Sequence, residues 1–205
     1  TLKEAARSAH LTPWQFRVAS PVPQVGHIYG LGVAGYWGST IEIEAVVHPL
    51  GNREKGTIHF NDTAGSMARD SVTNASSVVR MITGKNLSDY DVHVNVVGGG
   101  NIDGPSAGAA ITCAIISALT GKPLRQDIAV TGEISLSGRI KPVGGIAEKA
   151  FGAHQGGMKA ILIPKQNALD MGSEYMHMKV IPVDTIQDIL EHMLVRKKQK
   201  MKGSK

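Results

Sequence analysis

One serine in this chain stands where its hydroxyl could act as a nucleophile. Ser106 lies in the segment 103–108 (DGPSAG), which follows a glycine-rich run and opens a stretch with helical spacing. A serine hydroxyl is a weak nucleophile at neutral pH, so it needs a base beside it and hydrogen-bond donors for the oxyanion that forms. The first N–H groups of a helix lack partners within the helix and can supply such donors. The segment therefore indicates nucleophilic catalysis by Ser106.

A purely structural role is the alternative for this serine. Serine is a common residue at the N-cap of a helix, where its side chain contributes about 1 kcal/mol. The sequence around Ser106 (GGGNIDGPSAGAA) is unusual for a simple cap, because its glycines and alanines leave room for a substrate backbone. Catalysis is the preferred interpretation.

Lys149 is the candidate base. Helical spacing over residues 146–155 places it at the edge of an apolar face, near Ile146 and Ala153 and away from Glu148. An ammonium at such a position is partly desolvated, which lowers its pKa and lets the neutral amine accept a proton. The alternative is a surface lysine whose head reaches water along the helix.

Two other kinds of site fit the same glycine-rich segment. The spacing Gly104-x-Ser106-x-Gly108 matches the nucleophile elbow of esterases. An elbow directly follows its strand, whereas residues 98–103 intervene here, and three candidate triad histidines lie in no recognisable setting: His154, His177 and His192. A glycine loop that opens a helix can also bind phosphate, as in the GHMP small-molecule kinases, although the sequence has no Walker A pattern.

Thr131 and Glu133 are two further polar candidates. They fall on one face of a strand predicted over residues 127–135. Thr131 could hydrogen-bond Lys149 and orient it, and Glu133 could set the local charge. An ordinary strand threonine and a carboxylate at a strand end remain the alternatives.

The stretch 96–167 resembles the proteolytic domain of the Lon family of proteases. The matching pieces are DGPSAG at 103–108, TGEISLSGRIKPVGGIAEK at 131–149 and GGMKAILIPKQN at 156–167. The segment 30–47 is similar to the family's first hairpin, so the resemblance covers most of the chain. The DGPSAG form resembles the bacterial type rather than the archaeal membrane-anchored branch, while the loop 98–102 resembles that of shorter Lon-like proteins.

This resemblance implies a serine endopeptidase that uses a Ser–Lys dyad on unfolded or flexible polypeptides. Ser106 would be the nucleophile, Lys149 the general base and Thr131 the residue that orients the lysine, with Glu133 and Asp103 as further supporting residues. The implied oxyanion and substrate loop contains Gly98, Gly99, Gly100, Gly104 and Pro105. We expect no metal ligand and no cofactor in this chain.

The resemblance also implies a homo-hexameric ring in the full-length protein. ATP-driven unfolding would require an AAA+ module with ATP and Mg²⁺, and this sequence contains none. ATP dependence is therefore expected only if such a module lies upstream in a longer protein. Pro13, Pro21 and Pro23 fit a linker from it, and a first residue other than Met suggests a fragment or a processed product.

The elements that must position these residues predict the α+β class, as a two-layer α/β domain. The resemblance implies the Lon proteolytic-domain fold, related to the GHMP kinases and to the second domain of a small-subunit ribosomal protein. We expect a linker over 1–25, the proteolytic domain over 26–195 and a basic tail over 196–205. Strands are expected over 26–34, 40–47, 57–60, 91–97, 127–135, 139–143, 159–163 and 178–183, and helices over 2–10, 64–83, 106–120, 146–155 and 185–195.

The charge distribution and the number of cysteines limit the possible binding partners and the cellular compartment of this protein. The net charge of +5 arises from the tail 196–205, which carries six Lys/Arg and no acid, and the rest has 16 basic and 17 acidic residues. We therefore expect no nucleic-acid partner. Cys113 is the single cysteine, no secretory signal is visible, and the apolar run 107–119 is too short to span a bilayer. These features predict a cytoplasmic protein without a membrane partner.

Overall fold

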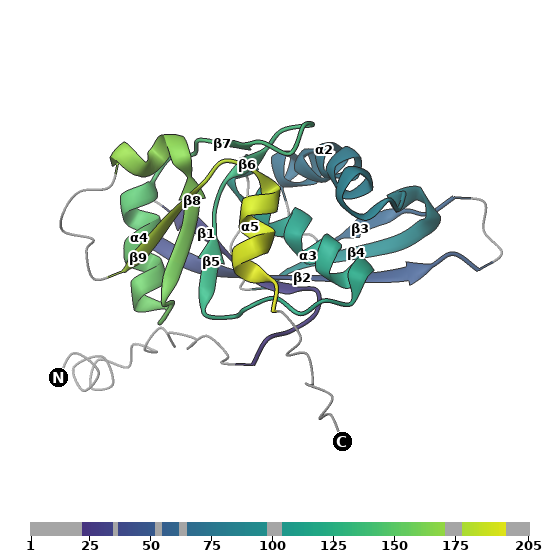
Figure 1. Cartoon of the computed structure of the whole chain (residues 1–205), viewed down its shortest axis with the longest axis horizontal. Helices are drawn as coiled ribbons and strands as arrows, with labels where there is room; N and C mark the ends of the chain where they lie inside the picture. The colour runs from purple at the N-terminus through teal and green to yellow at the C-terminus, as the bar shows by residue number, and fades with distance from the viewer. Residues whose placement is uncertain are drawn as a thin grey trace, which may run out of the picture.

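A seven-stranded mixed sheet is the central element of the computed structural model, which describes residues 22–34, 37–51, 55–61, 65–97, 104–170 and 178–195 (Figure 1). The strand order is β3-β4-β2-β1-β5-β8-β9. The strands are β1 (His27–Ala34), β2 (Trp37–Pro49), β3 (Ile58–Phe60), β4 (Tyr90–Val97), β5 (Ile128–Val130), β8 (Ala160–Pro164) and β9 (Lys179–Val183). A separate antiparallel pair is formed by β6 (Glu133–Ile134) and β7 (Ile140–Lys141).

Strand direction divides the sheet into two parts. β1 pairs antiparallel with β2, and β2 pairs antiparallel with β4, while β3 runs parallel to β4. On the other side β1, β5, β8 and β9 are all parallel. The carboxyl ends of these four strands therefore lie along one edge of the sheet, which is the edge where α/β proteins commonly place their sites.

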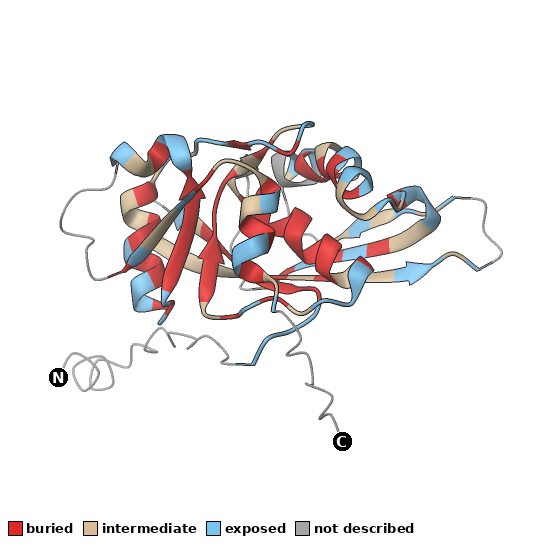
Figure 2. Cartoon of the chain, viewed as in Figure 1, coloured by how far each residue is buried: buried red, intermediate tan, exposed pale blue. Residues whose placement is uncertain are grey.

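Helices cover both faces of the sheet. The described helices are α2 (Ser66–Thr83), α3 (Gly108–Thr120), α4 (Ile146–Gln155) and α5 (Ile186–Met193), with 3-10 turns η1 (Leu87–Asp89), η2 (Pro105–Ala107) and η3 (Lys165–Asp170). α2, α3 and α5 pack against one face in the larger core cluster, and α4 packs against the opposite face in the smaller one. Figure 2 shows α3 as almost wholly buried in the centre of the molecule.

Local sequence explains where these elements form and end. In β4, Val92, Val94 and Val96 alternate with exposed residues, as a strand with one buried face requires. All of β8 is buried because helices cover it on both faces. Gly84 and Gly121 end α2 and α3 in the left-handed conformation, which glycine adopts without steric cost.

The structure confirms the α+β class and most of the expected elements, but one predicted strand is wrong. The expected strand over 127–135 is divided into β5 and β6. The chain leaves the main sheet at Gly132, whose N–H donates to the carbonyl of Ser106 instead of to a neighbouring strand. Thr131 and Glu133 therefore do not share the face of one strand.

Two predicted segments lie outside the described residues, namely the helix over 2–10 and the basic tail over 196–205. The linker assigned to 1–25 is described only from residue 22 onward. Among the described helices, none is both long enough and apolar enough to cross a lipid bilayer. Cys113 is buried within α3, and this burial raises the pKa of its thiol.

Candidate active site

Ser106 lies in the η2 turn, one residue before the N-cap of α3. That N-cap is Ala107, and no side chain caps the helix. Ser106 is half-buried, and its hydroxyl makes no hydrogen bond within the part of the chain that the structure describes. A capping role does not account for this serine, because its side chain is not engaged by the helix.

The backbone of Ser106 is held at the carboxyl end of β5. Its carbonyl oxygen accepts the N–H of Gly132 at 2.9 Å and the hydroxyl of Thr131 at 3.4 Å. In return, the N–H of Ala109 donates to the carbonyl of Gly132 at 3.1 Å. The serine turn and residues 131–132 are therefore joined through the backbone, as hydrogen bonds in a ladder would join two strands.

Small residues let other elements approach this turn closely. A Cβ atom at Gly108 would lie 3.0 Å from the Cβ of Ser71 on α2 and 3.3 Å from the side chain of Ile134 on β6. Ala107, Ala109 and the rest of the first turn of α3 are buried. A larger residue at position 108 would push the start of α3 away from α2, and Ser106 would move with it.

Lys149 lies on α4 and is only 4% exposed, so it is buried more deeply than the edge of the apolar face, where helical spacing placed it. Its neighbours on the buried face of the helix are Ile146, Ala150 and Ala153. Burial lowers the pKa of Lys149 from its ordinary value of 10.5 to about 8, and the adjacent carboxylate of Glu148 opposes this shift. Within the described residues its amino group forms no hydrogen bond or ion pair, so the amine is available to take up a proton.

Close backbone contacts fix α4 against the β1–β2 hairpin. A side chain at Gly38 would overlap the carbonyl of Glu148, and one at Gly152 would overlap the backbone of Gly38. At the start of the helix, Gly145 adopts a left-handed conformation with φ +68° and would meet Val33 if it carried a Cβ. Glycines at these positions allow the helix that carries Lys149 to lie directly on the hairpin.

Ser106 and Lys149 approach the same edge of the sheet from opposite faces. Val33, which contacts the start of α4, lies near the carboxyl end of β1, and Ser106 is bound at the carboxyl end of the parallel neighbour β5. Both η2 and α4 contact β1. The half-buried hydroxyl of Ser106 and the buried amine of Lys149 are thus carried by elements that both contact β1, at the edge of the sheet where its carboxyl end lies.

The other predicted site residues lie around the serine turn or outside the described residues. Thr131 is fully buried, and its hydroxyl donates to the carbonyl of Ser106. Its role in orienting Lys149 stays a prediction. Glu133 is half-buried on β6, opposite Lys141. Gly104 and Pro105 begin the η2 turn. Four residues lie outside the described residues: Gly98, Gly99, Gly100 and Asp103.

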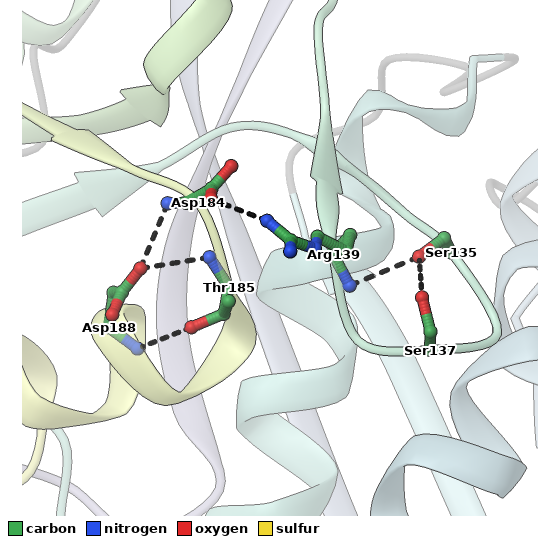
Figure 3. A network of polar contacts seen from close by, with 6 residues as sticks. All are labelled: Ser135, Ser137, Arg139, Asp184, Thr185 and Asp188. Atoms are coloured by element: carbon green, nitrogen blue, oxygen red, sulfur yellow. Dashed lines mark hydrogen bonds and ion pairs between the residues drawn. The ribbon is translucent and has the colours of Figure 1, made fainter.

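A polar network that sequence reasoning missed supports the β6–β7 hairpin beside this turn (Figure 3). Arg139 of the hairpin donates to Asp184 at 2.6 Å, and its backbone N–H donates to the hydroxyl of Ser135 at 3.0 Å. Thr185 and Asp188 form a capping box at the start of α5, and the N–H of Asp184 donates to the same Asp188 carboxylate. This N–H is the main cause of a lowered pKa at Asp188.

The network connects the hairpin to α5, and the hairpin in turn places Ile134 against Gly108 in the first turn of α3. The capping box was detectable in the sequence as a threonine followed by an acid at Asp188. The contact of Arg139 with Asp184 was not detectable, because it joins residues 45 positions apart.

Comparison with known proteins gives one consistent result. The family model described as "Lon protease (S16) C-terminal proteolytic domain" matches residues 9–196. Lon protease 2 of Bacillus subtilis (strain 168) is 38% identical over 92% of this chain, and the Lon protease of Brucella suis biovar 1 (strain 1330) is 38% identical over 84%. The archaeal Lon protease of Pyrococcus abyssi (strain GE5 / Orsay) is 35% identical over 86%.

The chain spans a minor part of each of these relatives: 36% of the Bacillus subtilis protein, 22% of the Brucella suis protein and 18% of the Pyrococcus abyssi protein. The matched family model nevertheless covers all of the described residues, including the η2 turn and α4. The chain therefore belongs to the Lon protease family, as a C-terminal proteolytic domain of the S16 type.

Proposed function

We propose that this chain is a serine endopeptidase domain in which Ser106 attacks the scissile carbonyl and Lys149 acts as the general base. The observation that carries the proposal is the burial of Lys149, which brings the pKa of its amine to about 8. An amine with this pKa is partly neutral near physiological pH, whereas an exposed lysine is almost wholly protonated. A base of this kind can take the proton of a serine hydroxyl during attack.

The first step transfers the proton of the Ser106 hydroxyl to the neutral amine of Lys149 while the oxygen adds to the peptide carbonyl. Backbone N–H groups around Gly104 to Ser106 would stabilise the oxyanion, since they precede α3 and are not used inside a helix. The ammonium then protonates the leaving amine, and an acyl-enzyme remains. Water activated by the same lysine hydrolyses this ester and regenerates the hydroxyl.

Thr131 supports the site through the serine turn. Its buried hydroxyl and the N–H of Gly132 both donate to the carbonyl of Ser106, so two hydrogen bonds orient the backbone of the nucleophile. Orientation of Lys149 by the same hydroxyl remains part of the proposal. It would require that the threonine accept from the lysine while it donates to Ser106, which one hydroxyl can do.

Family membership supports a proposal for the substrates and the assembly. We propose that the chain acts on unfolded or flexible polypeptides in the cytoplasm, as part of a homo-hexamer in the full-length protein. A ring would keep folded proteins away from the serine. ATP would drive cleavage only in a full-length protein that carries an AAA+ module, and neither nucleic acid nor a membrane is a proposed partner.

Peptide hydrolysis by matched variants tests this function. Wild type, Ser106→Ala, Lys149→Met and the control Lys165→Met are compared on a fluorogenic peptide and on casein, at high protein concentration so that assembly does not limit the rate. Lys165 is an exposed lysine outside the site, so its variant should keep the wild-type rate. Loss of cleavage in the first two variants supports the dyad. Retention of cleavage by Lys149→Met, or binding of MgATP by this chain without peptide hydrolysis, would contradict it.

A further inference from the structure

A buried histidine at the start of β1 has its protonation pattern fixed by a glutamine. The side-chain nitrogen of Gln126 donates to the carbonyls of His27 at 2.8 Å and Leu124 at 3.0 Å, so its amide orientation is determined. Its oxygen then faces Nδ1 of His27 at 2.5 Å. Because an amide oxygen can only accept, Nδ1 must carry the proton, and the lone pair of a neutral ring lies on Nε2.

That second nitrogen points at two carboxylates on β2. Nε2 of His27 lies 2.6 Å from Oε1 of Glu42, where it forms a hydrogen bond and ion pair when a proton lies between them, and Glu44 is the residue directly opposite His27 in the strand register. Ligand atoms of the three side chains all lie within 4.8 Å of one another. His27 is 5% exposed, and both glutamates are half-buried.

A second amide orients the further carboxylate. Asn95 on β4 donates to Oε2 of Glu44 at 3.0 Å, and Asn95 itself accepts from the side chain of Asn61 at 2.7 Å. The imidazole and this carboxylate are thus each supported from behind by an amide. Side chains that ligate metals are commonly held by such outer hydrogen bonds, which fix the tautomer and the orientation of the ligand.

We propose that His27, Glu42 and Glu44 form a binding site for a divalent transition-metal cation of the zinc type. One imidazole nitrogen and two carboxylate oxygens are a ligand set that zinc accepts, and a buried imidazole disfavours Mg²⁺ and Ca²⁺. The cation would take the place of a proton between Nε2 and Glu42 and would add Glu44 as a third ligand. The Nδ1 proton on Gln126 is the tautomer that ligation through Nε2 requires.

The site has a structural role rather than a part in peptide cleavage. His27 lies at the amino end of β1, whereas Ser106 is bound at the carboxyl end of the parallel strand β5, at the opposite edge of the sheet. The ligands connect β1 to β2, and Gln126 connects them to the segment before β5. A bound cation would therefore stabilise the sheet that supports the active site.

Metal binding to the chelator-treated 205-residue chain tests this proposal. We expect about one zinc ion per chain by elemental analysis after gel filtration, and a melting temperature raised by roughly 5–10 °C at a hundredfold excess of zinc over its dissociation constant. Glu44→Gln should weaken zinc binding at least tenfold in calorimetry, and Gln126→Ala about 10- to 100-fold.

His93→Asn is the matched control, because an exposed histidine group could bind zinc adventitiously. His93 stacks on His59 with ring centroids 4.7 Å apart and lies near His48 at 6.1 Å. The control should keep both the stoichiometry and the affinity of the wild type. Absence of zinc in the wild type, binding that survives Glu44→Gln unchanged, or binding that His93→Asn abolishes would each overturn the site.

Nitrogen NMR of the imidazole rings gives an independent readout in the wild-type protein. With zinc added at pH 7.5, His27 should be neutral, with its proton on Nδ1 and a metal-shifted Nε2 resonance. A His27 ring that carries protons on both nitrogens in the presence of zinc would show a histidine–glutamate ion pair in place of the metal site.

Discussion

Replacing Lys149 by methionine should make the protein more stable while it abolishes peptide cleavage. Lys149 is 4% exposed, and burial brings its pKa from 10.5 to about 8. Because the folded protein disfavours the ammonium, the lysine lowers the free energy of unfolding wherever it is charged in both states. Methionine has a similar length and no charge to desolvate, so the cost disappears with the substitution.

The size of this effect follows from the two pKa values. Each pKa unit corresponds to about 1.4 kcal/mol, so the difference between 10.5 and about 8 corresponds to about 3 kcal/mol below pH 8. Between pH 8 and 10.5 the unfolded chain binds more protons at this group than the folded chain does, so the cost decreases as the pH rises. At pH 7 we expect Lys149→Met to raise the free energy of unfolding by about 1–3 kcal/mol, which is a melting temperature higher by roughly 3–10 °C.

Urea unfolding followed by circular dichroism measures this difference at pH values between 6 and 10.5. Lys165→Met is the control, because Lys165 is exposed and its variant should follow the wild type at every pH. The difference between Lys149→Met and the wild type should be largest below pH 8 and should shrink as the pH rises. A variant that is less stable than the wild type at pH 7, or a difference that grows above pH 8, would refute the argument that the amine is desolvated.

The remaining predictions concern the serine turn and the contact that supports α4. Ser106→Ala should reduce kcat by at least about a thousandfold and change the melting temperature by under roughly 2 °C, measured by peptide assay and calorimetry, because the hydroxyl makes no described hydrogen bond. The pH profile of kcat/KM should rise through about pH 8, where Lys149 loses its proton, and a maximum in acid would contradict a neutral lysine base. Gly152→Ala should destabilise the protein by about 1–3 kcal/mol and lower kcat, because its Cβ would overlap the backbone of Gly38. An unchanged free energy of unfolding in urea would show that the contact between α4 and the β1–β2 hairpin can adjust to the added methyl group. Thr131→Val should cost about 1–3 kcal/mol, since it removes a buried hydroxyl, and should lower kcat more than it raises KM.

Periodicity in the sequence was sufficient to predict most of the helices and strands. The alternation of Val92, Val94 and Val96 predicted the buried face of β4, and helical spacing placed Lys149 at the edge of the apolar face of α4. Glycines marked the ends of α2 and α3, because the left-handed conformation that closes a helix favours this residue. These signals are local, so a single sequence contains them.

The division of β5 from β6 could not be predicted, because it depends on a contact between distant segments. Gly132 leaves the sheet to donate to Ser106, and the sequence over 128–131 does not show where the strand ends. The same limit applies to the hydrogen bond between Thr131 and Ser106, which the sequence did not predict. The threonine hydroxyl reaches a carbonyl 25 residues away, which no spacing rule within one strand describes.

The candidate metal site could not be predicted from the sequence, because its residues come together only in the folded sheet. His27 and Gln126 are 99 residues apart, and the register of β1 with β2 places His27 opposite Glu44. For the active site, the motif at residues 103–108 identified Ser106, while its position at the end of β5 required the fold.

The central claim is that Ser106 is a nucleophile activated by Lys149, and covalent labelling tests it most directly. The protein is treated with a serine-reactive fluorophosphonate near pH 8, digested, and analysed by mass spectrometry. We predict one adduct per chain on the peptide that contains Ser106, absent in Ser106→Ala and formed at least a hundredfold more slowly in Lys149→Met. Lys165→Met should be labelled at the wild-type rate. An adduct on another residue, or labelling of Ser106 that is equally fast without Lys149, would contradict the claim.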